Sequence, residues 1–367
     1  METIIKPYVL VFSLGALACA SSYAQTNVQI YGSVDEGVDY ISNVRGEHQM
    51  AVNSGKRSPD RIGFRGTEDL GDGMSAFFKL ETGLNSDTGA QANPTKIFNR
   101  YATVGLSDRR LGTLTLGRMP DFAYDYVGPL NNSVPGISWS YSPGNLDNLA
   151  NVYGIDNAVR YETPEFSGLQ LGVMNGFGED PTNFSTNRQY SFGLRYNDND
   201  LRVGASYSMF HNRTADLKAA FGVLNVLGQN LTSSVFNTTR FSTTVIGASY
   251  RVASIFVPHA TWTQITLENN RGQVEQRNFE AGVNIDVSGG DKTRFLGVSG
   301  AHSTFMDRKY NQLNLFITQY MSVSTQIYAG MAYVRASGPG AVAGAFGYQP
   351  SSGPSQVLAR TGVQVQF

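Results

Sequence analysis

Charged side chains of opposite sign fall in separate parts of this sequence. The stretch Met119–Val159 contains no Lys or Arg but carries Asp121 and Asp125. Basic residues instead occupy the segments before and after this stretch, at Arg61, Arg65, Lys79 and Arg160. If the two sets face each other across a water-filled gap, they impose a transverse electric field on any ion that passes between them. The chemistry that these residues predict is therefore electrostatic.

A plainer interpretation exists for both sets. Aspartate readily bonds to nearby backbone, so aspartates in a loop are also explained as turn formers. Basic residues directed into a wet interior are simply solvated, or pair with Glu81 or Glu162. Arg118 shares its strand parity with the apolar residues Leu114 and Leu116. It is therefore expected either at the narrow gap or above the membrane, where it would anchor the loop.

No constellation for catalysis emerges from the sequence. The four histidines are scattered without metal-ligand spacing, and there is no Gly-x-Ser-x-Gly motif. Glu68, Asp69 and Asp72 lack the spacing of a calcium loop and are better explained by a turn. We therefore expect no catalytic residue, no metal and no cofactor. A barrel enzyme, such as a lipase or protease with a Ser/His or Asp/His cluster at its rim, stays open as an alternative.

The elements that position these charges are predicted to be β-strands. In the segment from residue 60 to 81, Ile62 and Phe64 share one face of a strand, while Arg61 and Arg65 share the other. Such alternation fits a soluble sandwich, in which the polar face meets bulk water. It also fits a membrane β-barrel, in which apolar residues face lipid and polar ones face the interior.

The connections between strands favour the membrane barrel. Short turns, as at 108–112, 164–168, 197–200 and 288–291, alternate with long polar loops. The long loops are expected at about 42–57, 85–95, 119–154, 178–187, 211–240 and 337–355. Short turns on one rim and long loops on the other are typical of outer-membrane barrels.

Counting the alternating segments predicts sixteen antiparallel strands and an all-β fold. Their expected first residues are Asn27, Ser58, Met74, Lys96, Gly112, Ile155, Gly168, Asn187, Leu201, Arg240, Ser254, Gln273, Lys292, Lys309, Val323 and Ser355. The last strand ends on Phe367, as expected if it closes the barrel against the first strand and leaves no edge. A short helix capped by Thr214 is predicted in the loop between the ninth and tenth strands.

The start of the chain has the pattern of a secretory signal peptide. Lys6 provides a positive start, an apolar core follows, and a small-x-Ala site precedes Gln25. We expect residues 1–24 to be removed and residues 25–367 to form the barrel. A lipoprotein site at Cys19 is a weaker alternative, because the usual Leu three residues earlier is missing. The net charge of −1 indicates no basic surface for nucleic acid.

The motif at Arg61–Gly73 (RIGFRGTEDLGDG) resembles the general porins of Gram-negative outer membranes, in particular the β-proteobacterial type. Further matches are Tyr31-Gly32, Val104–Leu106, Leu116–Arg118, Asn157–Tyr161 and Phe367. The resemblance implies a sixteen-stranded, trimeric, water-filled pore, narrowed by a third external loop that folds inward. It also implies that Phe367 resembles the signal by which the assembly machinery accepts such barrels. Met119-Pro120 departs from the family pattern and leaves the path of the loop's first residues open.

The function expected from this resemblance is passive diffusion of ions and small hydrophilic solutes across the outer membrane. Over the predicted constriction residues, Arg61, Arg65 and Arg160 face Asp121 and Asp125, which predicts weak anion preference. The expected partners are these solutes, outer-membrane lipid and lipopolysaccharide, further copies of the chain in a homotrimer, and the barrel-assembly machinery. The sequence is also compatible with a substrate-specific porin, and with a structural or adhesive barrel whose lumen is plugged.

Overall fold

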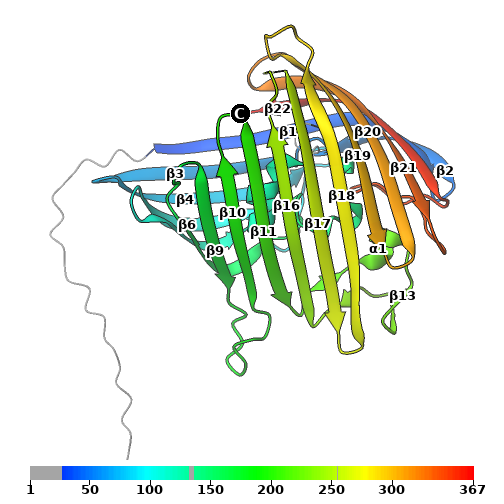
Figure 1. The fold of residues 1–367 in the computed structure, drawn as a ribbon, viewed down its shortest axis with the longest axis horizontal. Coiled ribbons are helices and arrows are strands. Elements are labelled where there is room, and N and C mark those ends of the chain that lie inside the picture. Colours follow the sequence, from blue (N-terminus) through cyan, green and yellow to red (C-terminus); the bar gives the residue numbers. More distant parts are fainter. Residues whose placement is uncertain (1–26, 132–135, 254) are drawn as a thin grey trace, which may run out of the picture.

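The computed structural model describes residues 27–131, 136–253 and 255–367. The expected signal peptide, residues 1–24, lies outside the described residues. Within the described residues, no helix is both long enough and apolar enough to cross a membrane. The chain is built mainly from long antiparallel strands (Figure 1).

The strands follow one another around a closed, 16-stranded antiparallel barrel. The strands of its wall are β1 (Asn27–Val44), β2 (Glu47–Ser54), β3 (Arg61–Gly71), β4 (Met74–Asn85), β6 (Tyr101–Asp108), β7 (Gly112–Met119), β8 (Ile155–Glu162), β9 (Leu169–Gly176), β10 (Gln189–Asn197), β11 (Leu201–His211), β16 (Arg240–Tyr250), β17 (Phe256–Asn269), β18 (Gly272–Asp286), β19 (Arg294–Phe305), β20 (Arg308–Tyr320), β21 (Thr325–Ser337) and β22 (Ser355–Gln366). β2 and β3 share one of the sixteen positions in the wall. The predicted all-β barrel of sixteen antiparallel strands is confirmed.

The barrel closes where the first strand meets the last. β1 pairs antiparallel with β22 from Ser33↔Gln366 to Ile41↔Leu358, and the backbone N–H of Gly32 donates to the carbonyl oxygen of Phe367 at 2.8 Å. Figure 1 shows these strands, blue and red, side by side. This pairing of the first and last strands closes the sheet, so neither β1 nor β22 is left as an unpaired edge in lipid.

One position of the wall is shared by two strands. β1 pairs along its other edge with β3 at residues 27–33 and with β2 at residues 36–44. The prediction that 42–57 is a loop is therefore wrong for most of its length, because this stretch contains β2. Met50 and Val52 point outward there and are 65% and 61% exposed. The intervening polar residues hid this alternation in the sequence.

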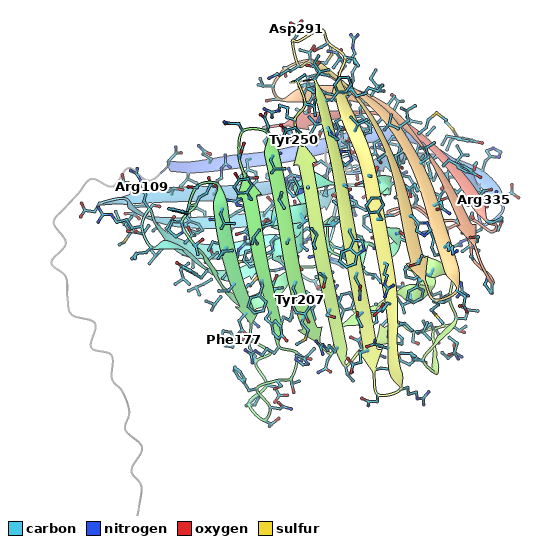
Figure 2. All side chains as sticks on the ribbon, in the orientation of Figure 1. Arg109, Phe177, Tyr207, Tyr250, Asp291 and Arg335 are labelled. Atoms are coloured by element: carbon cyan, nitrogen blue, oxygen red, sulfur yellow. The ribbon has the colours of Figure 1, made fainter. Side chains whose placement is uncertain are left out.

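The two faces of the wall differ in polarity as a membrane barrel requires. On β10, Phe192 and Leu194 are exposed on the outer face, while Ser191, of opposite parity, is fully buried inside. Apolar residues on the outer face match lipid, and polar ones match a wet interior. Figure 2 shows side chains of both kinds along the strands.

The two rims differ in loop length. Short turns at one rim include residues 72–73, 109–111 and 198–200, whereas the other rim carries the connections 120–154 and 212–239. Three connections at this second rim are tight, because β1–β2, β17–β18 and β19–β20 are joined by residues 45–46, 270–271 and 306–307 alone. The predicted asymmetry is therefore present, with these three exceptions.

The small elements lie in the loops. They are β5 (Ala90–Gln91), η1 (Ala123–Val127), η2 (Gly128–Leu130), η3 (Ser138–Ser140), η4 (Pro143–Asn145), β12 (Thr214–Ala215), α1 (Leu217–Phe221), β13 (Asn225–Val226), β14 (Gln229–Asn230) and β15 (Phe236–Asn237). A short helix was predicted here with Thr214 as its cap, but the cap is Asp216, whose Oδ1 accepts a hydrogen bond from the Ala219 N–H at 2.9 Å. Thr214 instead pairs with Asn237.

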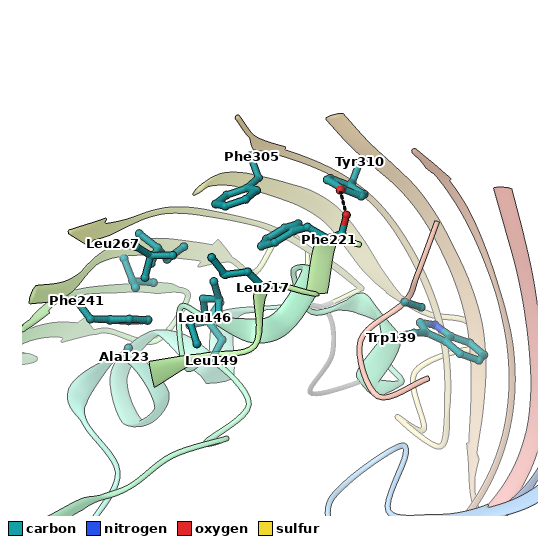
Figure 3. Close-up of a cluster of buried hydrophobic side chains, with 14 of the residues drawn as sticks. Ala123, Trp139, Leu146, Leu149, Leu217, Phe221, Phe241, Leu267, Phe305 and Tyr310 are labelled. Atoms are coloured by element: carbon teal, nitrogen blue, oxygen red, sulfur yellow. Dashed lines mark hydrogen bonds between the residues drawn. The ribbon is translucent and has the colours of Figure 1, made fainter. Parts of the chain in front are cut away.

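An apolar cluster connects three loops with the inner face of the wall (Figure 3). The Phe221 ring, from α1, stacks on Phe305 of β19 with centroids 4.2 Å apart. The Trp139 ring lies 6.0 Å from that of Tyr348 in the loop 338–354. Burial of this much aromatic surface stabilises the contact between loops that are far apart in sequence.

Candidate functional site

Residues 119–154, here called the aspartate segment, pack against the inner face of the wall. Phe122 lies over Gly172 of β9 and Gly193 of β10, where an added Cβ would lie 2.2 Å and 2.5 Å from its ring. Val127 lies in the same way over Gly247 of β16. These wall positions accept the segment because glycine leaves space for its side chains.

Asp121 is part of this packing. Its Oδ1 accepts a hydrogen bond from Asn148 Nδ2 at 2.9 Å, and its Oδ2 accepts one from Ser208 Oγ of β11 at 2.8 Å. The residue is 0% exposed, and burial raises the pKa of its carboxyl to about 6. Asp121 was predicted to face the pore, but its side chain does not reach solvent.

Further polar contacts hold the middle of the aspartate segment. Asp147 is buried, and its Oδ2 accepts hydrogen bonds from Ser142 Oγ and from Thr263 Oγ1 of β17, each at 3.0 Å. Burial raises the pKa of the Asp147 carboxyl. From the wall, Gln276 Nε2 donates to the carbonyl oxygen of Pro143 at 3.1 Å. The segment is thus bonded to several strands.

Asp125 is brought together with Arg160, as expected for a charged pair across the interior. Its Oδ2 forms a short ion pair with Arg160 Nη1, while Arg160 Nη2 lies 3.0 Å from Glu162 Oε1. Phe122 and Tyr126 lie near the guanidinium, 4.2 Å and 5.9 Å from its carbon to their ring centroids. Arg160 is therefore compensated by two carboxylates and does not stand alone against the segment.

Lys79 lies at the centre of a second charged group. Its Nζ is 3.8 Å from Glu81 Oε2 and 3.4 Å from the centroid of the Tyr101 ring. Glu81 is already bonded to Arg100, whose Nε lies 2.6 Å from its Oε1, and to the Tyr31 hydroxyl at 2.7 Å. Much of the positive charge of Lys79 is therefore left uncompensated.

Arg100 was missed by the sequence reasoning. The strand was expected to begin at Lys96, which gives Arg100 the parity of the outer face. The strand begins instead at Tyr101, so parity says nothing about the residue before it. The sequence signal that was present is Glu81, an inward carboxylate in the neighbouring strand.

Arg61 and Arg65 lie on the inward parity of β3, as predicted. Arg61 Nη1 donates to Ser58 Oγ at 2.9 Å and to the Pro59 carbonyl oxygen at 3.0 Å. Arg65 is exposed, and its Nε donates to Gln29 Oε1 at 2.9 Å. Among the described residues, neither guanidinium has a carboxylate oxygen within 4.0 Å.

Arg118 bonds to the ends of two loops. Its Nε donates to the Asn99 carbonyl oxygen at 2.8 Å, and its Nη1 donates to the Gly154 carbonyl oxygen at 3.3 Å and to Asp156 Oδ1 at 2.6 Å. Between the two expectations for this residue, these contacts correspond to the loop anchor.

A buried ion cluster joins the first and last strands and was also missed. Arg360 of β22 reaches Asp39 Oδ2 at 3.0 Å and Asp35 Oδ2 at 3.4 Å, and the Tyr328 hydroxyl donates to Asp35 Oδ1 at 2.5 Å. In the loop 338–354, the Tyr348 hydroxyl donates to Asp39 Oδ1 at 3.1 Å. Inward parity of two aspartates on β1 and an arginine on β22 is the sequence signal for this cluster.

Within the described ranges, no group of three or more His, Cys, Asp and Glu side chains has a geometry that holds a metal ion. His259 Nε2 lies 3.1 Å from Glu280 Oε1, and both residues are buried. Phe367 is 57% exposed, with its ring against Gly32 of β1. Its expected role as an assembly signal stays a prediction.

Comparison with known sequences decides the family. A sequence profile described as Gram-negative porin matches residues 11–339. The chain belongs to this porin family. Membership and the closed barrel together place this porin in the Gram-negative outer membrane.

Individual relatives and solved structures agree with this assignment. An outer membrane porin protein of Bordetella pertussis is 31% identical over 56% of this chain, and the match spans 60% of that relative's length. Outer membrane porin protein 32 of Delftia acidovorans is 26% identical over 95% of this chain and 97% of its own. The solved anion-selective porin from Comamonas acidovorans superposes with a TM-score of 0.75 at 22% identity, covering 94% of this chain and all of that one.

Proposed function

We propose that this porin is a passive diffusion channel for ions and small hydrophilic solutes, with weak anion preference and no catalytic role. The aspartate segment, bonded to the inner wall, narrows the channel. The observation that carries the proposal is the distribution of uncompensated charge on the inner face of β3 and β4. Arg61, Arg65 and Lys79 provide positive charge there, whereas Asp121 is buried and Asp125 is paired with Arg160.

Two further observations support anion preference. The carboxylate nearest to Lys79, on Glu81, is already bonded to Arg100. The structurally similar porin from Comamonas acidovorans is described as anion-selective. The excess of positive charge is small, so the preference is expected to be weak and to fade at high salt. The Debye length falls from ~10 Å at 0.1 M to ~3 Å at 1 M.

Arg65→Glu is expected to reverse the selectivity. The substitution replaces an exposed positive charge on the inner wall by a negative one, so the local excess changes sign. Reversal potentials across planar bilayers in a KCl gradient should show slight chloride preference for the wild type and potassium preference for the variant.

Two control substitutions separate wall charge from other effects. Arg109→Glu makes the same charge change in an exposed rim turn and should leave the reversal potential almost unchanged (Figure 2). Asp121→Asn removes a buried carboxylate and should also change the reversal potential little. If Asp121→Asn shifts the reversal potential while Arg65→Glu does not, the aspartate segment sets selectivity and the wall does not.

Conductance separates the channel from its rivals. A structural or adhesive barrel plugged by the apolar cluster passes no steady ion current, so a silent bilayer would contradict the proposal. A barrel enzyme would hydrolyse an ester or peptide. Hydrolysis by the purified protein that disappears on His259→Ala would replace the channel by an enzyme as the best interpretation.

A further inference from the structure

A trough of about 330 Å³ lies on the inner wall between β3 and β8, with η1 beside it. Its lining includes Arg65 and Lys79 on one side, Asp125, Arg160 and Glu162 on the other, and Thr115 between them. The volume is at the lower end of the range for small-molecule sites, about 300–1,000 Å³. The two sides differ in charge.

The side formed by β3 and β4 is positive. Arg65 and Lys79 are direct cross-strand neighbours in the β3–β4 register. Arg65 has no carboxylate oxygen within 4.0 Å among the residues that the structure describes. Glu81 lies 3.8 Å from Lys79 but is already bonded to Arg100. The Lys79 side chain is 33% exposed, so a carboxylate in the trough has access to it.

The side formed by β8 and η1 is negative. One guanidinium, that of Arg160, serves two carboxylates, those of Asp125 and Glu162. The three groups together therefore carry one negative charge. The side chains of Asp125 and Glu162 are 23% and 18% exposed, whereas that of Arg160 is 7% exposed. A solute in the trough meets the carboxylates more readily than the guanidinium.

Tyr101 contacts both the positive and the negative side of the trough, so its contacts limit the distance between the two sides. Lys79 Nζ lies 3.4 Å from the ring centroid, and the hydroxyl of the same ring donates to Asp125 Oδ1 at 3.2 Å. The ammonium nitrogen is therefore separated from this carboxylate oxygen by at most the sum of these two contacts and the distance from the ring centre to the hydroxyl oxygen. After a contact of about 3 Å at each end, room is left only for two opposite charges separated by a few bonds.

We propose that this trough binds neutral α-amino acids as zwitterions, with the carboxylate on Lys79 and Arg65 and the ammonium on Asp125 and Glu162. A dicarboxylate fits poorly, because its second carboxylate would meet Arg160, which is already paired with Asp125 and Glu162. Phe77 supplies apolar surface for an aliphatic side chain. The proposal rests on the channel function and names a class of solute that the channel would favour.

L-leucine and two analogues test the requirement for both charges. 4-Methylpentanoate lacks the ammonium group, and 3-methylbutylamine lacks the carboxylate. With wild-type channels in a planar bilayer at 0.1 M KCl, leucine should reduce the ion current saturably. Each analogue should bind about tenfold more weakly, because a hydrogen bond between charged groups contributes about one such factor. Equal binding of leucine and 4-methylpentanoate would show a simple anion site and overturn the proposal.

Matched variants test the residues. Lys79→Gln and Glu162→Gln should each weaken leucine binding about tenfold, with Asp125→Asn as a substitute if Glu162→Gln does not fold. Arg202→Gln and Glu165→Gln remove a charge of the same sign outside the trough lining and should leave the half-saturating concentration unchanged. Unchanged binding in Lys79→Gln would also overturn the proposal.

A measurement without current distinguishes failure of the trough from failure of the channel. Saturation-transfer NMR with the full chain in detergent reports leucine binding directly. Leucine binding without any bilayer current would refute the channel and retain the trough. Steady current without leucine binding would refute the trough and retain the channel.

Discussion

At the scale of single residues, pairing between charged groups decides which charges a solute meets. Asp125 was expected to oppose free arginines, but Arg160 is bonded to both Asp125 and Glu162. Arg65 also points inward from the barrel wall, but it has no carboxylate partner among the described residues. The electric field inside the barrel therefore follows from the difference between paired and unpaired groups, which a count of charges does not give.

Asp121→Asn is expected to stabilise the protein at neutral pH and to leave it unchanged in acid. Burial raises the pKa of the folded-state carboxyl from 3.8 to about 6, so the folded state holds its proton more tightly than the unfolded state does. The destabilisation is therefore absent below about pH 4 and complete above about pH 6. At pH 7.5 the variant should gain at most about 3 kcal/mol.

Apparent Tm values from circular dichroism in detergent, at pH 4 and pH 7.5, give the comparison for this substitution. Other titrating groups are common to both proteins and cancel in the difference between them. A Tm difference that is the same at both pH values would show that the Asp121 carboxyl is not perturbed by burial.

The sequence predicted which way the charged side chains point, but not which partners they contact. The inward direction of Arg65, Lys79 and Arg160 follows from the two-residue period of a strand, which is local information. The burial of Asp121 depends on Ser208, which is distant in sequence and lies close only after the wall has formed. No local pattern contains that contact.

At the scale of elements, strand and loop positions were predictable to different degrees. Alternation located the strand beginnings at Met74, Gly112 and Ile155, and at most others within a few residues. It failed for β2, where polar residues interrupt the pattern, and within the aspartate segment, which was expected to lack regular structure but contains short helical turns such as η1. Those turns are stabilised by packing on the wall, so their sequence alone does not specify them.

Gly193→Leu is expected to displace the aspartate segment. A Cβ at this position would already lie 2.5 Å from the Phe122 ring, so a larger side chain pushes Phe122 and η1 away from β10. Overpacking of this kind costs about 1–3 kcal/mol. Moving the segment toward the opposite wall should lower the single-channel conductance in planar bilayers.

A second substitution makes that experiment specific. Phe122→Ala in the Gly193→Leu background removes the clash and should restore much of the conductance. Gly300→Leu adds the same side chain to β19 where an added Cβ meets almost nothing, and should leave conductance at the wild-type value. Equal conductance in all these variants would show that Phe122 does not hold the segment in place.

At the scale of the whole molecule, we expect a homotrimer that resists detergent until it is heated. A closed barrel has no unpaired strand edge, so detergent has no backbone to compete for at room temperature. The trimer is the assembly that the resemblance of this sequence to general porins implies. Electrophoresis of unheated and boiled samples should show a large species that converts to a monomer of 39.9 kDa or less. An unheated sample that runs only as a monomer, even after cross-linking, would contradict the trimer.

The apolar cluster also bears on the order in which parts of the protein fold. Trp139 of the aspartate segment packs on Tyr348, and Tyr348 bonds to Asp39, a partner 309 positions away in the sequence. Contacts between such distant residues form late, since the intervening chain must first be brought into register. We therefore expect the interior of the channel to form last, after the hairpin of β21 and β22 has joined β1 and turned a curved sheet into a closed barrel. On this expectation, closure of the barrel wall and completion of the channel interior occur in the same folding step.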